Sequence, residues 1–274
     1  MSVIKLYKGD CLEILKTFPE NFIDTCITDP PYELGFLGKK WDSTGISFQP
    51  TTWREVLRVL KPGATLLAFG APKKYHRLAC AIEDAGFEIN DCISWVYGSG
   101  YPKNINLSKA IDKKFGAKRK VIGRAKKAND IIRRNRPKPN NKDWDRGCRY
   151  DDDWLDGTAD ITAPATPEAE LWDGWGTQLK PAWEGIVVAQ KPKDGTYVEN
   201  ALTWGVSGFW IDGGKVPPVI EGEEERYPAD FIHDGSDEVL DRFDNEERMP
   251  SRFFYTAKPS KKEKNIGGVV NNHP

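Results

Sequence analysis

"NFIDTCITDPPY", residues 21–32, decides the fold that this sequence predicts. Apolar side chains recur along its first part, as in a buried strand, and the strand stops at Pro30 and Pro31. Proline fixes φ and has no amide hydrogen, so the two prolines make a rigid turn whose carbonyl groups can act as acceptors. With the Asp29 carboxylate before it and the Tyr32 ring after it, this turn suits a flat ring that carries an exocyclic amine. The alternative interpretation is an ordinary strand exit with a buried tyrosine.

Strand and helix patterns alternate on both sides of this turn. In such α/β arrangements the sheet is parallel, and ligands bind at the carboxyl ends of its strands, which is where the turn lies. The sequence predicts further strands over residues 2–10, 64–70, 87–98 and 182–190, a last one within 251–265, and helices over 11–19, 51–63, 72–86 and 198–206.

The charge pattern changes after residue 100. Residues 113–149 hold fifteen Lys and Arg against three Asp and Glu, whereas 150–179 hold eight acidic residues and no Lys or Arg. Neither stretch has clear periodicity. We therefore predict a catalytic α/β half over 1–100, an inserted, loop-rich basic and acidic region over 101–179, and a continuation of the catalytic domain over 180–274.

The composition excludes some classes of protein but does not identify this one. The 274 residues are 39% apolar and 30% charged with a net charge of −1, so the overall charge indicates no partner. No apolar run reaches the roughly 20 residues of a membrane span, and no secretory signal is visible at the N-terminus. Five cysteines without C-x-x-C spacing favour a reduced, cytoplasmic protein, and three scattered histidines give no reason to expect a metal site.

"TDPPY" resembles the catalytic motif of amino-group DNA methyltransferases, which use S-adenosyl-L-methionine. An Asp in first position is more typical of the N6-adenine enzymes, whereas N4-cytosine enzymes more often have Ser there. The order of several segments resembles the permuted, β-type, phage-type adenine methylases of bacterial or phage-infected cells. These segments are "GDCLEILKTFPENFIDTCITDPPY", "LKPGATLLAFG", "ISWVYGSGYPKNINLSKAID", "LKPAWEGIVVAQKP", "SGFWIDGGKV" and "SRFFYTAKPSKKEKN".

The resemblance implies a partial Rossmann-like S-adenosyl-L-methionine-dependent methyltransferase sheet and a role for each matching residue. Asp29 and the Pro30 carbonyl would hold the N6 amine of adenine, with Pro31 in the same motif, and Tyr32 would stack on a base flipped out of the duplex. Asp10 matches the acid that contacts the cofactor's adenine, although a helix N-cap is an equal alternative. Trp183 lies where the family has a second aromatic near the base, with core packing as its alternative.

The basic stretch is placed where the family has its target-recognition region. We expect its cations to neutralise the phosphates of double-stranded DNA, unless they form a solvated surface or the acidic stretch folds back on them. These cations are Lys118, Arg119, Lys120, Arg124, Lys126, Lys127, Arg133, Arg134 and Arg136.

The position of the turn predicts the order of the two halves. Only 28 residues precede Asp29, fewer than the about 30 that one βαβ unit needs, so a Gly-rich cofactor loop would have to follow the catalytic half. No such loop follows in this chain, which is expected to be truncated before it. The alternatives are a non-catalytic DNA-binding remnant, a chain completed by a homodimer or by a separate cofactor half, and an N4-cytosine or RNA amino-methyltransferase.

Overall fold

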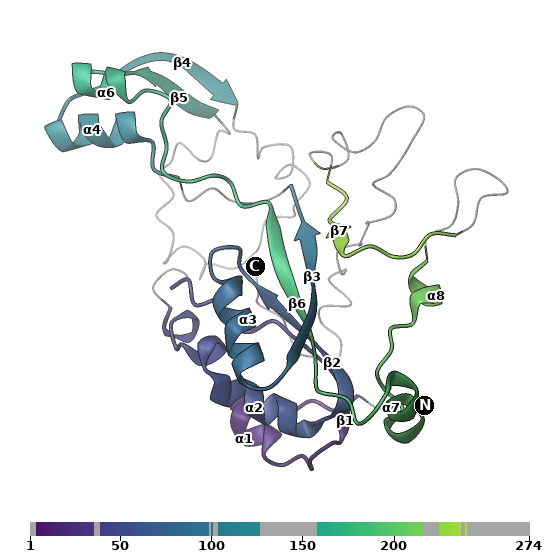
Figure 1. Cartoon of the computed structure of the whole chain (residues 1–274). Coiled ribbons are helices and arrows are strands. Elements are labelled where there is room, and N and C mark those ends of the chain that lie inside the picture. The colour runs from purple at the N-terminus through teal and green to yellow at the C-terminus, as the bar shows by residue number, and fades with distance from the viewer. Residues whose placement is uncertain are drawn as a thin grey trace. The chain divides into compact units, whose positions relative to one another are not determined.

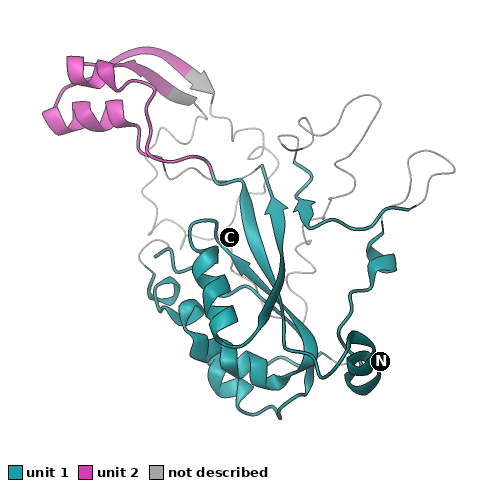
Figure 2. Ribbon diagram, viewed as in Figure 1, with its two compact units in different colours: residues 1–100, 181–274 teal, residues 101–180 magenta. Residues whose placement is uncertain are grey.

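The structure is a computed structural model that describes residues 4–35, 39–98, 100, 104–126, 158–215, 225–236 and 239. The chain divides into two compact units, shown in different colours in Figure 2. Unit 1 comprises residues 1–100 and 181–274, and unit 2 comprises residues 101–180. Within the described ranges, no helix is both long enough and apolar enough to cross a membrane.

Unit 1 contains a five-stranded sheet, and the helices formed by residues 11–84 lie together on one side of it (Figure 1). The strand order is β1-β2-β6-β3-β7. In chain order its elements are α1 (Cys11–Leu15), β1 (Ile23–Thr28), η2 (Lys40–Asp42), η3 (Ile46–Phe48), α2 (Pro50–Val59), β2 (Leu60–Gly70), α3 (Tyr75–Asp84), β3 (Glu88–Val96), β6 (Trp183–Gln190), α7 (Tyr197–Trp204), α8 (Ile211–Gly214) and β7 (Phe231–His233).

The sheet is mixed, whereas the sequence predicted a parallel one. β1 pairs with β2 and β3 pairs with β7 in parallel, but β6 runs antiparallel to both β2 and β3. The direction of β6 follows from where the chain leaves β3 and where it re-enters the sheet. Val96, the last residue of β3, pairs with Trp183, the first of β6, and the Tyr97 amide donates to the Ala182 carbonyl at 2.9 Å. Because β6 begins at the end of the sheet where β3 stops, it has to run back along β3.

The core lies between β2 and the helices α2 and α3. Pro50 occupies the first turn of α2, where its missing amide hydrogen costs nothing, and the apolar residues of this helix then recur at helical spacing. The α2 and α3 side chains cover the face of β2 that carries Leu66, which has no exposed surface. The largest members of the core are Trp53, Val56, Leu60, Leu66, Leu78, Ile82, Phe87 and Val187.

Two of the expected elements differ from the structure. Residues 4–8 form no strand, because nothing in the described ranges pairs with them, and Ile4 and Leu6 are 70% and 64% exposed. The helix expected from residue 51 begins at Pro50 with Gln49 as its N-cap, and ends at Val59 because β2 starts at the next residue. The strand expected within 251–265 lies outside the described residues.

Unit 2 has more regular structure than the predicted loop-rich insertion. Its described residues form two helices and an antiparallel pair of strands, held together by Asp112, which is 1% exposed. The Asp112 carboxylate accepts from Arg119 at 2.6 Å, from the Thr166 hydroxyl at 2.8 Å and from the Ala165 amide at 3.0 Å. The elements of unit 2 are α4 (Leu107–Phe115), β4 (Lys120–Lys126), β5 (Thr158–Ala163) and α6 (Pro167–Leu171).

Candidate active site

The Asp-Pro-Pro-Tyr turn follows directly after β1, at the carboxyl end of that strand. Asp29 is exposed, whereas Pro30, Pro31 and Tyr32 are half-buried. The neighbouring β2 is parallel to β1 and ends at the same edge of the sheet. The turn therefore stands at the edge where ligands bind in open α/β sheets, with its carboxylate facing solvent and its ring against the protein.

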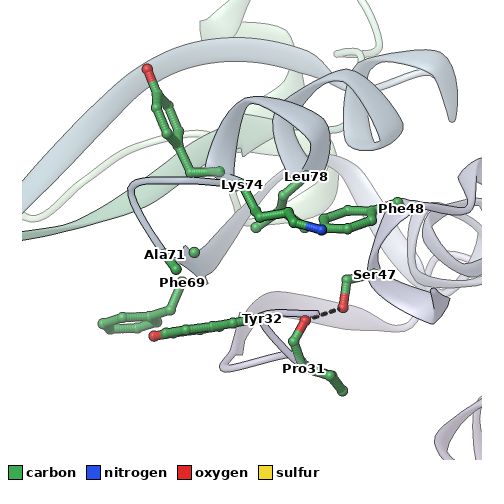
Figure 3. Close-up of a pocket in the computed structure, with 10 residues that line it drawn as sticks. Pro31, Tyr32, Ser47, Phe48, Phe69, Ala71, Lys74 and Leu78 are labelled. Atoms are coloured by element: carbon green, nitrogen blue, oxygen red, sulfur yellow. Dashed lines mark hydrogen bonds between the residues drawn. The ribbon is translucent and has the colours of Figure 1, made fainter. Parts of the chain in front are cut away.

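A hydrogen-bonded support holds the turn from behind. The Ser47 hydroxyl, on η3, donates to the Pro31 carbonyl at 2.5 Å, as the dashed line in Figure 3 shows. Ser47 is 2% exposed, and its own carbonyl accepts from the Trp53 indole at 2.9 Å. Because Trp53 belongs to the core on α2, this chain of contacts fixes the second proline of the turn to the centre of unit 1.

The residue after the turn takes a conformation that non-glycine residues seldom adopt. Glu33 has φ 56°, and its amide donates to the Asp42 carboxylate at 2.8 Å. The Glu33 carboxylate in turn accepts from the Thr44 hydroxyl at 3.1 Å. These contacts compensate the unfavourable backbone conformation and turn the chain away immediately after Tyr32.

The hydroxyl of Tyr32 meets a carboxylate from a distant part of the sequence. It donates to Glu184, near the start of β6, at 3.0 Å. Burial raises the pKa of Tyr32 well above its ordinary value, and the charges of Glu184 and Asp29 act in the same direction, so the hydroxyl stays protonated. For the same reason the pKa of Tyr97 is raised to about 12, first by burial and then by Glu184, to which its hydroxyl also hydrogen-bonds.

Glu184 lies among groups that disfavour its negative charge. Burial raises its pKa, and the Asp29 charge adds to this, while hydrogen bonds from Tyr32 and Tyr97 act in the opposite direction. The side chains that meet at this edge of unit 1 thus include two carboxyl groups and two tyrosine hydroxyls. Such a set can accept hydrogen bonds from an amine and offer aromatic surface to a flat ring.

A small, mainly apolar cavity borders the turn on the side of α3 (Figure 3). Lys74 crosses it, with its Nζ 5.5 Å from the centre of the Phe48 ring. The lining residues are Pro31, Tyr32, Ser47, Phe48, Phe69, Gly70, Ala71, Lys74, Tyr75 and Leu78.

Two residues expected at the site by resemblance have contacts that fit their alternatives. Asp10 accepts from the Leu12 amide at 2.8 Å and is the N-cap of α1, with no strand before it. Trp183 packs its ring edge against Tyr75, with the ring centres 5.7 Å apart, so in this structure it is part of the packing beside the cavity. Among the described residues, no group of three or more His, Cys, Asp or Glu side chains could hold a metal ion.

The expected DNA-contacting cations differ in their surroundings. Lys118 and Lys120 are exposed, and Arg124 is exposed but paired at 3.2 Å with Asp160 across the hairpin, so the acidic stretch does fold back on part of the basic one. Arg119 is only 12% exposed and donates to Asp112, so we assign it to the internal structure of unit 2. Of Lys126 only the backbone is described, and the remaining cations, Lys127, Arg133, Arg134 and Arg136, lie outside the described residues.

Sequence reasoning missed the residues that support the turn. Ser47 carries no sequence signal, since a serine in a short loop segment is common. Glu184 carries a weak one, because it is the single charged residue in the strand "WEGIVVAQ". A charge at the start of an otherwise apolar strand indicates a polar partner, but the sequence does not show which one.

The model of the DNA methylase family N6_N4_Mtase matches residues 23–207, and the chain therefore belongs to this N6/N4 family of DNA methylases. The type II methyltransferase M.BamHI of Bacillus amyloliquefaciens is 39% identical over 75 residues, which cover 25% of this chain and 18% of that protein. M.HpaI of Haemophilus parainfluenzae is 33% identical over 113 residues, which cover 38% and 35%. The chain thus spans well under half the length of these relatives.

Solved structures were compared with the whole chain. TTHA0409 of Thermus thermophilus, in its complex with S-adenosyl-L-methionine, has a TM-score of 0.33 and 18% sequence identity. The match covers 68% of this chain and 52% of TTHA0409.

Proposed function

We propose that this chain binds the target base of a DNA methyltransferase and that the methylated atom is the N6 amine of adenine in double-stranded DNA. The observation that carries the proposal is the Asp-Pro-Pro-Tyr turn at the carboxyl end of β1, in a chain of the N6/N4 family. The Asp in first position favours adenine, as the family resemblance implies.

The turn offers three acceptors. The Asp29 carboxylate and the Pro30 carbonyl differ in their surroundings from the Pro31 carbonyl. The Pro31 carbonyl already accepts from Ser47, whereas the Asp29 carboxylate is exposed apart from its contact with the Tyr32 hydroxyl, and no group of the described residues donates to the Pro30 carbonyl. Asp29 and Pro30 can therefore accept the two hydrogens of one amine. Such contacts hold the amine in place and draw its hydrogens toward the acceptors, which makes the nitrogen lone pair more available to an electrophile.

Tyr32 supplies the aromatic surface. Enzymes that modify a base in duplex DNA take it out of the stack and bind it against aromatic side chains. The Tyr32 ring lies next to the two acceptors in sequence and is held at its hydroxyl end by Glu184. We assign to Tyr32 the stacking of the extruded adenine.

S-adenosyl-L-methionine is the proposed methyl donor, and when bound it would supply an electrophilic methyl group on sulfur. The described residues do not fit a complete site for it. Asp10, the one residue expected to contact it, caps α1, and within the described ranges the glycines Gly98 and Gly100 lead into no helix before Leu107. The steps assigned to this chain therefore concern the base alone.

Unit 2 is proposed to contact the phosphates of the target DNA. This assignment rests on Lys118 and Lys120, because both side chains are exposed, whereas Arg119 is paired with Asp112. Replacing both by Ala should reduce DNA affinity uniformly across sequences and lower the slope of log affinity against log salt by about 2.

The test is transfer of tritium from labelled S-adenosyl-L-methionine to unmethylated genomic DNA by the 274-residue chain, followed by separation of the nucleosides. Label in N6-methyladenine supports the proposal. Label in N4-methylcytosine would show that the target base is cytosine and not adenine, and label only in RNA would exclude DNA as the substrate. An absence of transfer, together with DNA binding and no heat on titration with cofactor, would show that these 274 residues bind DNA without the cofactor.

The variant Asp29→Ala should lose transfer, because one acceptor of the amine is removed. Asp24→Ala is the matched control, since Asp24 lies on β1, the strand that leads to Asp29, is 69% exposed and contacts Lys61 on the surface. Equal activity of the Asp29 variant and the control would exclude the role assigned to Asp29.

A further inference from the structure

Glu184 is the point where three separate segments of unit 1 meet. It lies on β6 opposite Trp95 of β3, accepts the Tyr32 hydroxyl from the turn after β1, and receives the hydroxyl of Tyr97, which follows β3. In the sheet order, β6 is separated from β1 by β2. The Tyr32 side chain therefore reaches past the end of β2 to make this contact.

The surroundings of Glu184 are unusual for a carboxylate that serves only stability. Its charge is disfavoured by burial and by Asp29, and no cation of the described residues is among the groups that act on it. Carboxylates in such places are normally paired with a cation, or replaced by apolar residues at little cost. A tyrosine pair is what compensates the charge here, which ties the presence of Glu184 to the placement of those rings.

Tyr32 is held at both ends. Its backbone end follows Pro31, whose carbonyl accepts from the buried Ser47, and its far end donates to Glu184 at 3.0 Å. A fixed hydroxyl oxygen determines only the direction of the ring, because this oxygen lies on the axis of the second rotatable bond. The phenolic O–H bond prefers to lie in the plane of the ring, so the direction of the hydrogen bond to Glu184 restricts the rotation about that axis. A base can stack only on a ring whose plane is parallel to its own.

We propose that Glu184 is a positioning residue that sets the plane of the Tyr32 ring for the target base. This inference rests on the proposed function, because it presumes that Tyr32 stacks on a base. Glu184 touches neither base nor donor in this assignment; it acts through the Tyr32 hydroxyl. Tyr97 shares Glu184 but is not next to the turn, so its loss should leave the ring of Tyr32 in place.

The first experiment measures the ring without any substrate. The protein is labelled with 13C at the tyrosine rings, and the Tyr32 resonances are assigned with Tyr32→Phe. Glu184→Ala should shift the Tyr32 resonances, while Glu184→Gln, which keeps an oxygen acceptor, should leave them near their original positions. Unchanged Tyr32 resonances in folded Glu184→Ala protein would overturn the proposal.

The second experiment measures base stacking by the quenching of 2-aminopurine in a single-stranded oligonucleotide. Tyr32→Phe and Glu184→Ala should each weaken binding of this probe by at most about tenfold, because the hydrogen bond that orients the ring is worth about that factor. Because both act through one contact, the double variant should be no weaker than either single variant. Tyr197→Phe is the control, because Tyr197 is an exposed tyrosine on α7, and this variant should bind as the original protein does.

The outcomes separate this inference from the proposed function. Multiplying losses in the double variant, or full binding by Glu184→Ala, would overturn the positioning role even if methyl transfer to DNA is observed. If the original protein neither quenches the probe nor transfers methyl groups, the proposed function fails and the positioning role fails with it, whereas the ring resonances still report whether the Tyr32–Glu184 contact exists.

Discussion

Replacing Ser47 by Ala removes one hydroxyl and tests how the Asp-Pro-Pro-Tyr turn is supported. The Ser47 Oγ donates to the Pro31 carbonyl at 2.5 Å from a position that is 2% exposed, and Pro31, whose carbonyl loses its partner, is half-buried. A buried polar group left without a partner costs about 1–3 kcal/mol, and the half-buried position of Pro31 sets the expected loss at the lower end of this range. A domain is typically stable by about 5–15 kcal/mol, so the loss is a large fraction of the total.

Urea unfolding followed by tryptophan fluorescence measures this loss. We expect the unfolding midpoint of Ser47→Ala to fall with an unchanged slope, since the surface exposed on unfolding stays the same. Ser43→Ala is the matched control, because Ser43 is an exposed serine in the same connection and its loss should change the free energy by less than about 0.5 kcal/mol.

The outcome that contradicts this reasoning is equal stability of the two variants. It would mean that the Pro31 carbonyl finds another donor, and that the turn does not depend on η3. Reduced stability with unchanged quenching of the 2-aminopurine probe would show instead that the contact stabilises unit 1 without setting the geometry of the turn.

Three further predictions follow from particular residues. Gly63→Ala should lower the melting temperature far more than Gly116→Ala, because both have positive φ, 75° and 68°, but only at Gly63 would the new methyl carbon overlap a neighbouring side chain, that of Ser207. Burial raises the pKa of Cys26 to about 11, so at about pH 8 iodoacetamide should modify the exposed Cys80 well before Cys26, as peptide mass spectrometry would show. Burial raises the pKa of Glu184, so the folded state binds its proton more tightly than the unfolded state does; stability to urea should fall as pH rises from the ordinary glutamate value through the raised one, and Glu184→Gln should remove this fall.

Local patterns were sufficient for much of unit 1. The helical spacing of apolar residues in α2 and α3 depends only on neighbouring residues, as does the end of β1 before Pro30. The expected strands β1, β2 and β3 are present. The direction of β6 was wrong in the prediction because strand direction depends on where the chain re-enters the sheet. That depends on the path of the intervening residues 101–180, which periodicity does not describe.

The candidate site was predictable only where it is continuous in sequence. Asp29 to Tyr32 form one motif, but Ser47 is 16 residues from Pro31, and Glu184 is 152 residues from Tyr32. Arg119 shows the converse, since its position in a basic run indicated DNA contact, whereas its guanidinium donates to the buried Asp112. Charge runs report composition, and which cations face solvent is decided by packing.

The adjoining ends of β3 and β6 have a consequence for how such a protein can diversify. A methyl group on Gly100 would overlap the Pro181 carbonyl oxygen, so the two strands that enclose unit 2 touch where it departs and returns. A segment whose ends already meet can be exchanged for one of different length with little change in the entropy of closing the loop. Under the function proposed above, the sheet and its Asp-Pro-Pro-Tyr turn can thus be combined with a different unit 2, and a change of DNA target need not alter the residues assigned to the base.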